Sequence, residues 1–154
     1  MSRLIVVMIV AHLLTMGASV MAAQGSGYDE NALRVVSRQG NMRILRGIDG
    51  TVVASGGVLH GPRLAHLVSQ SENAVAEAKI FERDYDPGQS LLGVGIAFLG
   101  AAIGASRITD INPVIQVGLY ATAFASLGYG GRKLHSAYEA LSRAIWWYNR
   151  DLKR

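Results

Sequence analysis

Residues 90–106 have the sequence SLLGVGIAFLGAAIGAS, and residues 111–131 have the sequence INPVIQVGLYATAFASLGYGG. Neither stretch contains a charged side chain, while the short segment between them contains Arg107 and Asp110. At about 1.5 Å per residue the two stretches span roughly 26 and 32 Å, close to the ~30 Å thickness of a bilayer core. The pattern therefore predicts two transmembrane helices joined by a tight turn. The alternative is the buried hairpin of a soluble protein, but so short a chain offers little material to cover two apolar helices.

Small residues recur along both apolar stretches at helical spacing. In lipid, helices associate through close backbone contact, which small side chains permit. We expect two small faces to pack on each other through Gly93, Ala97, Gly100, Gly104, Gly118, Ala121, Ala125 and Gly128. A homo-oligomeric pore lined by small residues is the alternative, although both stretches lack the ionisable groups that mark most ion pathways.

Amphipathic patterns flank both apolar stretches. Residues 62–86 predict a stalk helix that begins at Pro62 and stops or kinks at Asp86-Pro87-Gly88. Residues 132–154 predict a basic C-terminal helix, which either packs on the stalk helix or lies on an anionic membrane surface. We favour packing, because both helices have heptad-like seams that would otherwise be unpaired. The seams are Leu64, Leu67, Ser71, Ala74, Ala78, Phe81 and Tyr85 in the stalk, and Leu134, Tyr138, Leu141, Ile145, Tyr148 and Leu152 in the C-terminal helix.

Residues 23–57 predict a small antiparallel β-meander. The segments LRVVSR, MRILRG and TVVAS have the β-branched composition of strands, and they are separated by Gly40 and by the turn pair Asp49-Gly50. Arg34, Arg38, Arg43 and Arg46 would suit a basic face with an anionic partner. We favour a solvated outer face of the sheet, and we expect no nucleic-acid partner, because no aromatic side chains interleave with these arginines.

Residues 1–22 have the three parts of a secretory signal: Arg3 near the start, an apolar stretch over residues 4–16, and a small-residue end that suits cleavage after Ala22. An uncleaved anchor is the alternative, but the apolar stretch spans only about 20 Å. Export would place most basic residues outside and only Arg107 inside. That arrangement opposes the positive-inside tendency, so the predicted orientation depends on the signal segment.

Composition excludes several classes of protein. Half of the 154 residues are hydrophobic and 17% are charged, against roughly 25% in ordinary soluble domains, which argues against disorder. The absence of cysteine excludes a disulfide scaffold, a thiol nucleophile and a cysteine-ligated metal. His60 and His66 are poorly spaced for shared metal ligation, and Asp84 and Asp86 lack the rest of a calcium-loop pattern. We expect no catalytic site, no metal and no cofactor.

The segment AIWWYNR, residues 144–150, resembles the end of a group of small exported bacterial proteins of unknown function. The resemblance implies a signal peptide, a β-rich start, a Gly-rich pair of hydrophobic helices and a C-terminal helix ending in an A-I-W-x-Y-N type motif. The Gly and Ala spacing is also similar to that of glycine-zipper envelope proteins, although the G-x-x-x-G series of that family appears here only at Gly100 and Gly104. Neither group supplies a catalytic residue.

The sequence thus predicts an α+β, mostly α fold: a small N-terminal antiparallel β-meander followed by a long antiparallel helical hairpin whose central halves are transmembrane. The predicted protein is exported and non-enzymatic, with a structural or adaptor role in the cell envelope. Its partners would be the lipid bilayer, a second copy or an envelope protein, and its meander and C-terminal helix would lie on the periplasmic or extracellular side. The alternative function is an oligomeric pore or a transporter accessory subunit. The expected partner patch is Trp146, Trp147, Tyr148 and Asn149.

Overall fold

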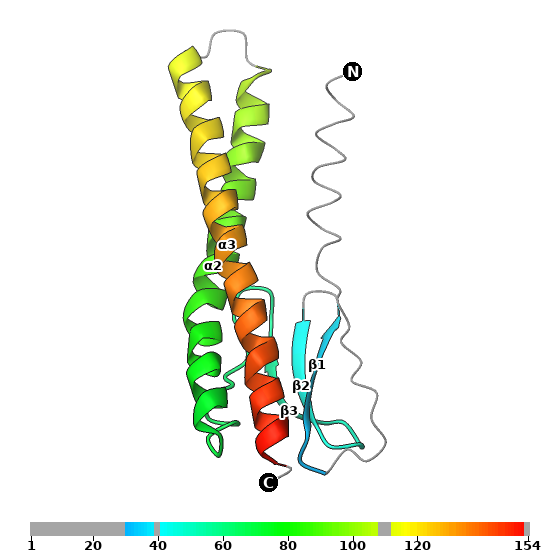
Figure 1. Cartoon of the computed structure of the whole chain (residues 1–154). Coiled ribbons are helices and arrows are strands. Elements are labelled where there is room, and N and C mark those ends of the chain that lie inside the picture. The colour runs from blue at the N-terminus through cyan, green and yellow to red at the C-terminus, as the bar shows by residue number, and fades with distance from the viewer. Residues whose placement is uncertain (1–29, 39–40, 108–111, 153–154) are drawn as a thin grey trace, which may run out of the picture.

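The computed structural model describes residues 30–38, 41–107 and 112–152, which form a small sheet and a long helical hairpin. Figure 1 shows the two helices side by side, with the sheet against one half of the hairpin. The predicted order of a small antiparallel sheet and then a mostly helical hairpin is confirmed. The predicted signal segment, residues 1–22, lies outside the described residues. The elements are β1 (Leu33–Arg38), β2 (Asn41–Arg46), β3 (Thr51–Gly56), α2 (Glu72–Ala105) and α3 (Pro113–Asp151).

The sheet is an antiparallel meander in the order β1-β2-β3. Leu33 pairs with Arg46 at one end, and Met42 pairs with Gly56 at the other. The turn between β2 and β3 contains Gly50 at a φ of 69°, which confirms the turn expected at Asp49-Gly50. The strands lie within a residue of their predicted positions, because the turn residues on both sides leave little freedom in where each strand begins.

Helix α2 does not stop at Asp86-Pro87-Gly88, one of the two predicted outcomes, but continues through Pro87 to Ala105. Proline in a helix interior removes one backbone hydrogen bond and normally breaks the helix. Here contacts on both sides of Pro87 hold the helix: Gly88 packs closely against Leu134 of α3, and Asp86 accepts a hydrogen bond from the backbone of Gly61. The stalk and the first apolar stretch are therefore one helix, as are the second apolar stretch and the C-terminal segment.

The prediction that a helix begins at Pro62 is wrong. Residues 65–70 form turns, and α2 begins at Glu72 with Ser71 as its N-cap, whose hydroxyl accepts a hydrogen bond from the backbone N–H of Ala74. Serine at the N-cap and an acidic residue in the first turn are strong helix starters. The connection before the helix is fixed by Glu82, whose Oε1 accepts hydrogen bonds from the backbone amides of Leu64 at 2.6 Å and Ala65 at 2.9 Å.

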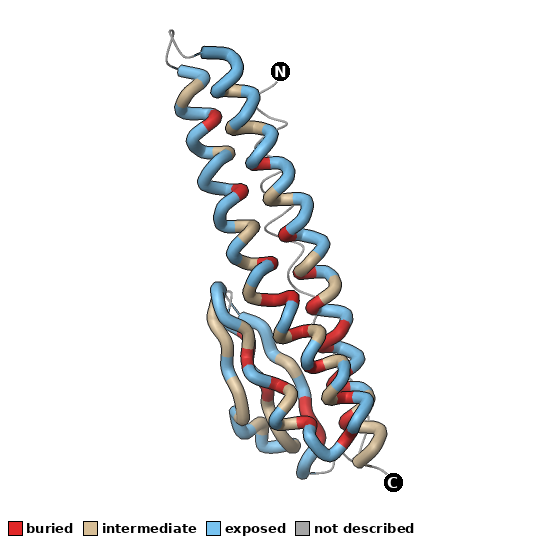
Figure 2. Tube along the Cα trace, turned by 90° about the vertical axis from the view of Figure 1, so that its left-hand side faces the viewer, coloured by how far each residue is buried: buried red, intermediate tan, exposed pale blue. Residues whose placement is uncertain are grey.

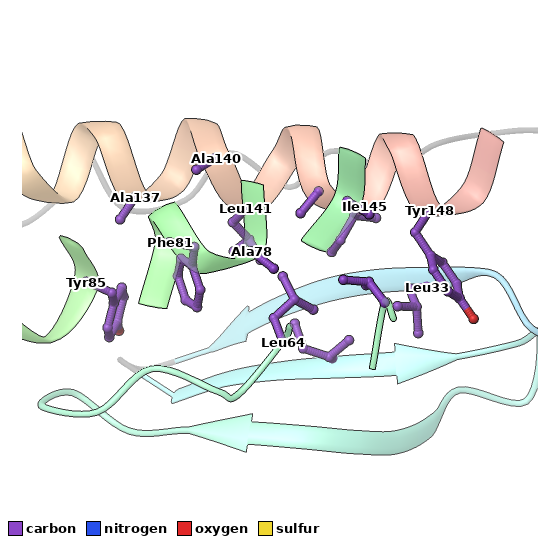
Figure 3. Close-up of a cluster of buried hydrophobic side chains, with 14 of the residues drawn as sticks. Leu33, Leu64, Ala78, Phe81, Tyr85, Ala137, Ala140, Leu141, Ile145 and Tyr148 are labelled. Atoms are coloured by element: carbon purple, nitrogen blue, oxygen red, sulfur yellow. The ribbon is translucent and has the colours of Figure 1, made fainter. Parts of the chain in front are cut away.

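The core lies where the sheet meets the base of the hairpin (Figure 3). Both predicted seams contribute to it, although Tyr138 is exposed and Leu67 and Leu152 are only partly buried. Burial of each large apolar side chain stabilises the fold by about 1.5–3 kcal/mol. The C-terminal part of α3 therefore packs on α2 and the sheet, as favoured. The large buried members are Leu33, Met42, Ile44, Leu64, Val68, Phe81, Tyr85, Leu134, Leu141, Ile145 and Tyr148.

Of the described helices, only α2 is long and apolar enough to cross a membrane on its own. The prediction that both helices qualify is therefore confirmed only for α2. The apolar stretch of α3 is uncharged but carries polar atoms at Gln116, Tyr120, Ser126 and Tyr129, which lower its hydropathy.

One side chain ties the first strand to the last helix. Asn149 of α3 accepts a hydrogen bond from the backbone N–H of Leu33 at 2.7 Å and donates one to the carbonyl of the same residue at 2.8 Å. The amide of Asn149 thus satisfies both backbone groups of Leu33, at the start of strand β1.

Replacing Asn149 with alanine should therefore destabilise the protein by about 1–3 kcal/mol, because both backbone groups of Leu33 lose their partner at a partly buried site. Denaturant unfolding in mild detergent measures the change. Asn41→Ala, which removes an exposed asparagine from the same sheet, is the matched control and should change stability by less than about 0.5 kcal/mol. Equal effects of the two substitutions would show that Asn149 does not hold the sheet on the helix.

Candidate functional site

The half of the hairpin remote from the sheet is the most unusual surface of the molecule. This distal half comprises residues 88–105 of α2 and residues 113–131 of α3, and it contains no charged side chain. Figure 2 shows it extending beyond the sheet with isolated buried positions among exposed ones. Its exposed large hydrophobic residues are Val94, Ile96, Phe98, Ile103, Val114, Ile115, Val117, Phe124 and Tyr129. A folded chain in water does not normally present so large an apolar surface.

The two helices meet in the distal half through small residues repeated every seven positions. On α2 the buried positions are Gly88, Gly95 and Ala102, and on α3 they are Ala123 and Gly130. A Cβ added at Gly95 would lie 2.6 Å from the Leu127 side chain, and one added at Gly130 would lie 3.0 Å from the carbonyl oxygen of Gly88. Leucines of α3 thus rest on glycines of α2, with backbones too close for larger residues.

The prediction that the two small faces pack on each other is wrong within one chain. An added Cβ would meet nothing within 4 Å at any of the five glycines in the predicted set: Gly93, Gly100, Gly104, Gly118 and Gly128. The three predicted alanines, Ala97, Ala121 and Ala125, are also exposed. Both sets of small residues have helical spacing, and the contact follows the set that continues the seven-residue repeat of the core, from Phe81 on α2 and from Ala137 on α3. The predicted faces therefore point outward.

Two adjacent glycines provide a matched test of the helix contact. Gly130→Leu should destabilise the hairpin by about 2 kcal/mol or more, because its side chain would meet the backbone of α2. Gly131→Leu places the same side chain in open space and should leave stability unchanged or slightly higher, since leucine favours a helix more than glycine does. Thermal unfolding in mild detergent measures both. Equal melting temperatures for the two variants would contradict this helix contact.

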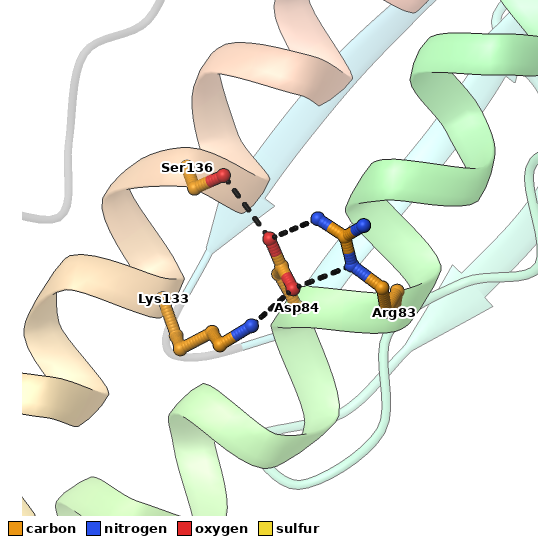
Figure 4. A network of polar contacts seen from close by, with 4 residues as sticks. All are labelled: Arg83, Asp84, Lys133 and Ser136. Atoms are coloured by element: carbon orange, nitrogen blue, oxygen red, sulfur yellow. Dashed lines mark hydrogen bonds and ion pairs between the residues drawn. The ribbon is translucent and has the colours of Figure 1, made fainter.

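A polar network lies where the distal half joins the rest of the molecule (Figure 4). Its centre is Asp84 of α2, whose side chain is only 3% exposed. Its carboxylate accepts hydrogen bonds from Arg83 at 2.9 and 3.0 Å, from Lys133 of α3 at 2.7 Å and from Ser136 of α3 at 3.1 Å. We call these four residues the collar. A buried carboxylate with this many donors is fully compensated.

The hydrogen bonds from Arg83 in particular, helped by those from Lys133 and Ser136, hold the pKa of Asp84 well below its usual range, although burial alone would raise it. In the unfolded chain the group has a pKa of about 4. The charged Asp84 therefore stabilises the folded state above that pH. This contribution is lost progressively as the pH falls below about 4 toward the lower folded pKa.

Asp84→Asn should reduce the free energy of unfolding by about 2 kcal/mol at pH 7, because an amide cannot accept all of these charged donors. The difference from the unsubstituted protein should narrow as the pH falls below about 4. Urea unfolding at pH 7 and pH 3 measures both effects. Glu139→Gln removes an exposed carboxylate from α3 and serves as the control. A constant difference between Asp84→Asn and the unsubstituted protein at the two pH values would contradict the ionised, stabilising state of Asp84.

The predicted partner patch is divided by the helix. Tyr148 is buried in the core, and Asn149 is bonded to Leu33. Trp147 packs partly against the core, whereas Trp146 is 57% exposed. The two indole rings contact each other edge to face, and the guanidinium of Arg150 lies 3.8 Å from the centre of the Trp147 ring. Successive residues of a helix point about 100° apart, so four in a row cannot form one flat patch.

The arginines of the sheet are also divided. Arg34, Arg38 and Arg43 share the outer face, whereas the alternation of β2 places Arg46 on the face of Met42 and Ile44. The three outer arginines form no ion pair with a carboxylate of the described residues. The expected solvated face is consistent with their exposure.

The two histidines considered as metal ligands do not share a site. His60 lies 3.6 Å from the carboxylate of Asp86, and His66 lines a separate open depression with Arg46. Among the described residues, no group of three or more His, Asp or Glu side chains is placed to hold a metal ion.

The sequence reasoning missed two features. The first is the role of Asp84, for which a signal exists: an acidic residue between the buried positions Phe81 and Tyr85 faces a helix that carries a lysine. The second is the seven-residue repeat of small residues, which runs through both apolar stretches. Comparison with protein-family models, with curated proteins and with solved structures gives no match. The resemblance to small exported bacterial proteins therefore stays a prediction.

Proposed function

We propose that this chain is a membrane hairpin protein of the cell envelope, with its distal half in the lipid bilayer and its head in water. The head comprises the three strands, the connection to α2, and the helix segments 72–87 and 132–152. The observation that carries this proposal is the uncharged distal half, where nine large hydrophobic side chains are exposed on only two helices. Leaving them in water would cost on the order of 10 kcal/mol.

The dimensions of the distal half support this placement. The 18 residues of α2 from Gly88 to Ala105 measure roughly 27 Å, close to the ~30 Å thickness of a bilayer core. The corresponding part of α3 has a similar length. The collar, where Lys133 is bonded to Asp84, lies at one end, and Arg107 lies at the other.

Two polar side chains in the apolar stretch of α3 are placed so that a bilayer can accommodate them. The hydroxyl of Thr122 donates a hydrogen bond to the carbonyl of Gly118 at 2.9 Å. Gln116 is half-buried and stands seven residues before Ala123, on the side that faces α2. Paired with α2, α3 can therefore occupy a bilayer even though it does not qualify as a span alone.

The proposal also includes export of the head across the membrane and an adaptor role for it. The signal-like residues 1–22 support a head on the periplasmic or extracellular side. Trp146, held beside Arg150, is the exposed aromatic anchor that would contact an envelope partner. The function is structural, with no catalytic activity.

An oligomeric pore or transporter accessory subunit is the second candidate. The outward small faces, with open space at Gly93, Gly100 and Gly104 of α2 and at Gly118 and Gly128 of α3, favour contact with a second copy in lipid. A concentration-dependent ion leak from vesicles that contain the protein would select this function over a structural one.

Insertion can be tested with two identical substitutions at similarly exposed isoleucines. Ile96 lies in the middle of the distal part of α2 and is 61% exposed, and Ile48 lies in the β2–β3 turn of the head and is 68% exposed. Ile96→Lys should reduce flotation of the purified protein with vesicles by about tenfold or more, because a lysine at the centre of a bilayer costs about 2.5–3.5 kcal/mol. Flotation in a density gradient gives the membrane-bound fraction.

Ile48→Lys is the control and should float like the unsubstituted protein. A failure of the unsubstituted protein to float, or equal flotation of both variants, would contradict insertion of the distal half.

A further inference from the structure

The turn after strand β3 presents two adjacent apolar side chains to solvent. Val58 is 56% exposed and Leu59 is 57% exposed. They occupy the tip of a turn closed by a hydrogen bond of 2.8 Å from the backbone N–H of Gly57 to the carbonyl of His60. Neither side chain belongs to the core cluster, so packing among the described residues does not explain their apolar character.

The turn is held beside α2 at the level where the distal half begins. The backbone N–H of Gly61 donates to the carboxylate of Asp86 at 2.8 Å, and the hydroxyl of Tyr85 lies 3.3 Å from the carbonyl oxygen of Gly57. The Nδ1 atom of His60 lies 3.6 Å from the same carboxylate. Asp86 precedes the distal half by two residues. Figure 1 shows the connection that follows β3 rising beside the helices to this level.

We propose that the turn of residues 57–60 is a second membrane contact, in which Val58 and Leu59 insert into the interfacial layer of the bilayer that holds the distal half. This inference rests on the proposed function, because it is the boundary of the inserted hairpin that places the turn at the lipid surface. Apolar side chains at the tip of a rigid turn partition favourably into that layer. The head would then be fixed at three points, the two helices and the turn.

The surroundings of the turn fit an anionic lipid surface. Met42, at the start of β2, pairs with Gly56, at the end of β3. The end of the sheet where β1 passes into β2 is therefore also the end from which the turn of residues 57–60 leaves. Arg38 and Arg43 are exposed there without a carboxylate partner among the described residues. A depression of about 350 Å³ beside the turn is lined by Asn41, Arg43, Ser55, Gly56 and Gly57. Arginines near the surface of an anionic membrane strengthen binding through electrostatic attraction to the lipid headgroups.

The opposite end of the sheet also has an exposed arginine, Arg34, which donates a hydrogen bond to the carbonyl of Ile48 at 3.3 Å, but that end lies away from the distal half and so supplies a control. Ile48 is exposed to a similar degree, but its turn lies at the Leu33 end of the sheet, where Asn149 near the C-terminal end of α3 ties β1 to the hairpin base. Along α3, the collar and the distal half are more than ten residues away from Asn149. The same apolar exposure therefore occurs at two levels, of which only one is at the membrane boundary.

The test uses the full chain, which has no cysteine and so accepts single labels. Leu59→Cys, Ile48→Cys and Ile96→Cys are each labelled with a fluorophore and reconstituted into phosphatidylcholine vesicles with and without phosphatidylglycerol. Quenching by brominated lipid reports contact with the bilayer, and quenching by acrylamide reports contact with water. We expect the label at residue 59 to be quenched by brominated lipid at least roughly twofold more than that at residue 48, and more strongly with phosphatidylglycerol.

The label at residue 96 separates the two proposals. If brominated lipid quenches residue 96 while residue 59 behaves like residue 48, the membrane contact of the turn is refuted and the inserted hairpin stands. If brominated lipid quenches none of the three labels, both proposals fail. A label at residue 59 that is protected from acrylamide without lipid quenching would mean that protein covers the turn, and this would also overturn the proposal.

Discussion

The close approach of α2 and α3 is the contact on which the rest of the structure depends. Small residues at every seventh position bring the backbones together, and leucines of α3 rest on the glycines of α2. This contact carries α2 through Pro87 and turns the large apolar side chains of the distal half outward. The same repeat has a large residue, Phe81, near the sheet and only small residues beyond it, so the core is thick near the sheet and thin in the distal half.

The environment of each half follows from what covers it. Near the sheet, the sheet, the connection to α2 and the two helices together supply enough apolar surface to bury phenylalanine, tyrosine and leucine side chains. Beyond Gly88, no third element among the described residues covers the two helices, so only the positions between them are buried. The collar marks the change: Asp84 satisfies charged groups from both helices just before the uncharged stretch begins. We therefore infer that lipid replaces the missing layer.

Local sequence signals predicted the strands and the two seams well, because turn residues and apolar periodicity act over a few neighbouring positions. The failures arise where distant contacts prevail. Contacts with Leu134 and Gly61 hold the helix at Pro87, and Ser71 rather than Pro62 provides its N-cap. Small residues spaced by three and four, as at Gly100 and Gly104, cannot be distinguished from the buried seven-residue set without knowing which face meets the sheet. The division of the tryptophan patch follows from local helix geometry, whereas the bond of Asn149 to Leu33 joins residues 116 positions apart and has no local signal.

Membrane topology is the most direct measurement of the central claim. A reporter that is active on only one side of the membrane is fused once after Arg154 and once directly after Arg107, between the two helices. An exported hairpin that crosses the bilayer predicts that the C-terminal fusion reports outside and the fusion after Arg107 reports inside. If both fusions report the same side, the distal half does not cross that membrane, and the proposed function is contradicted.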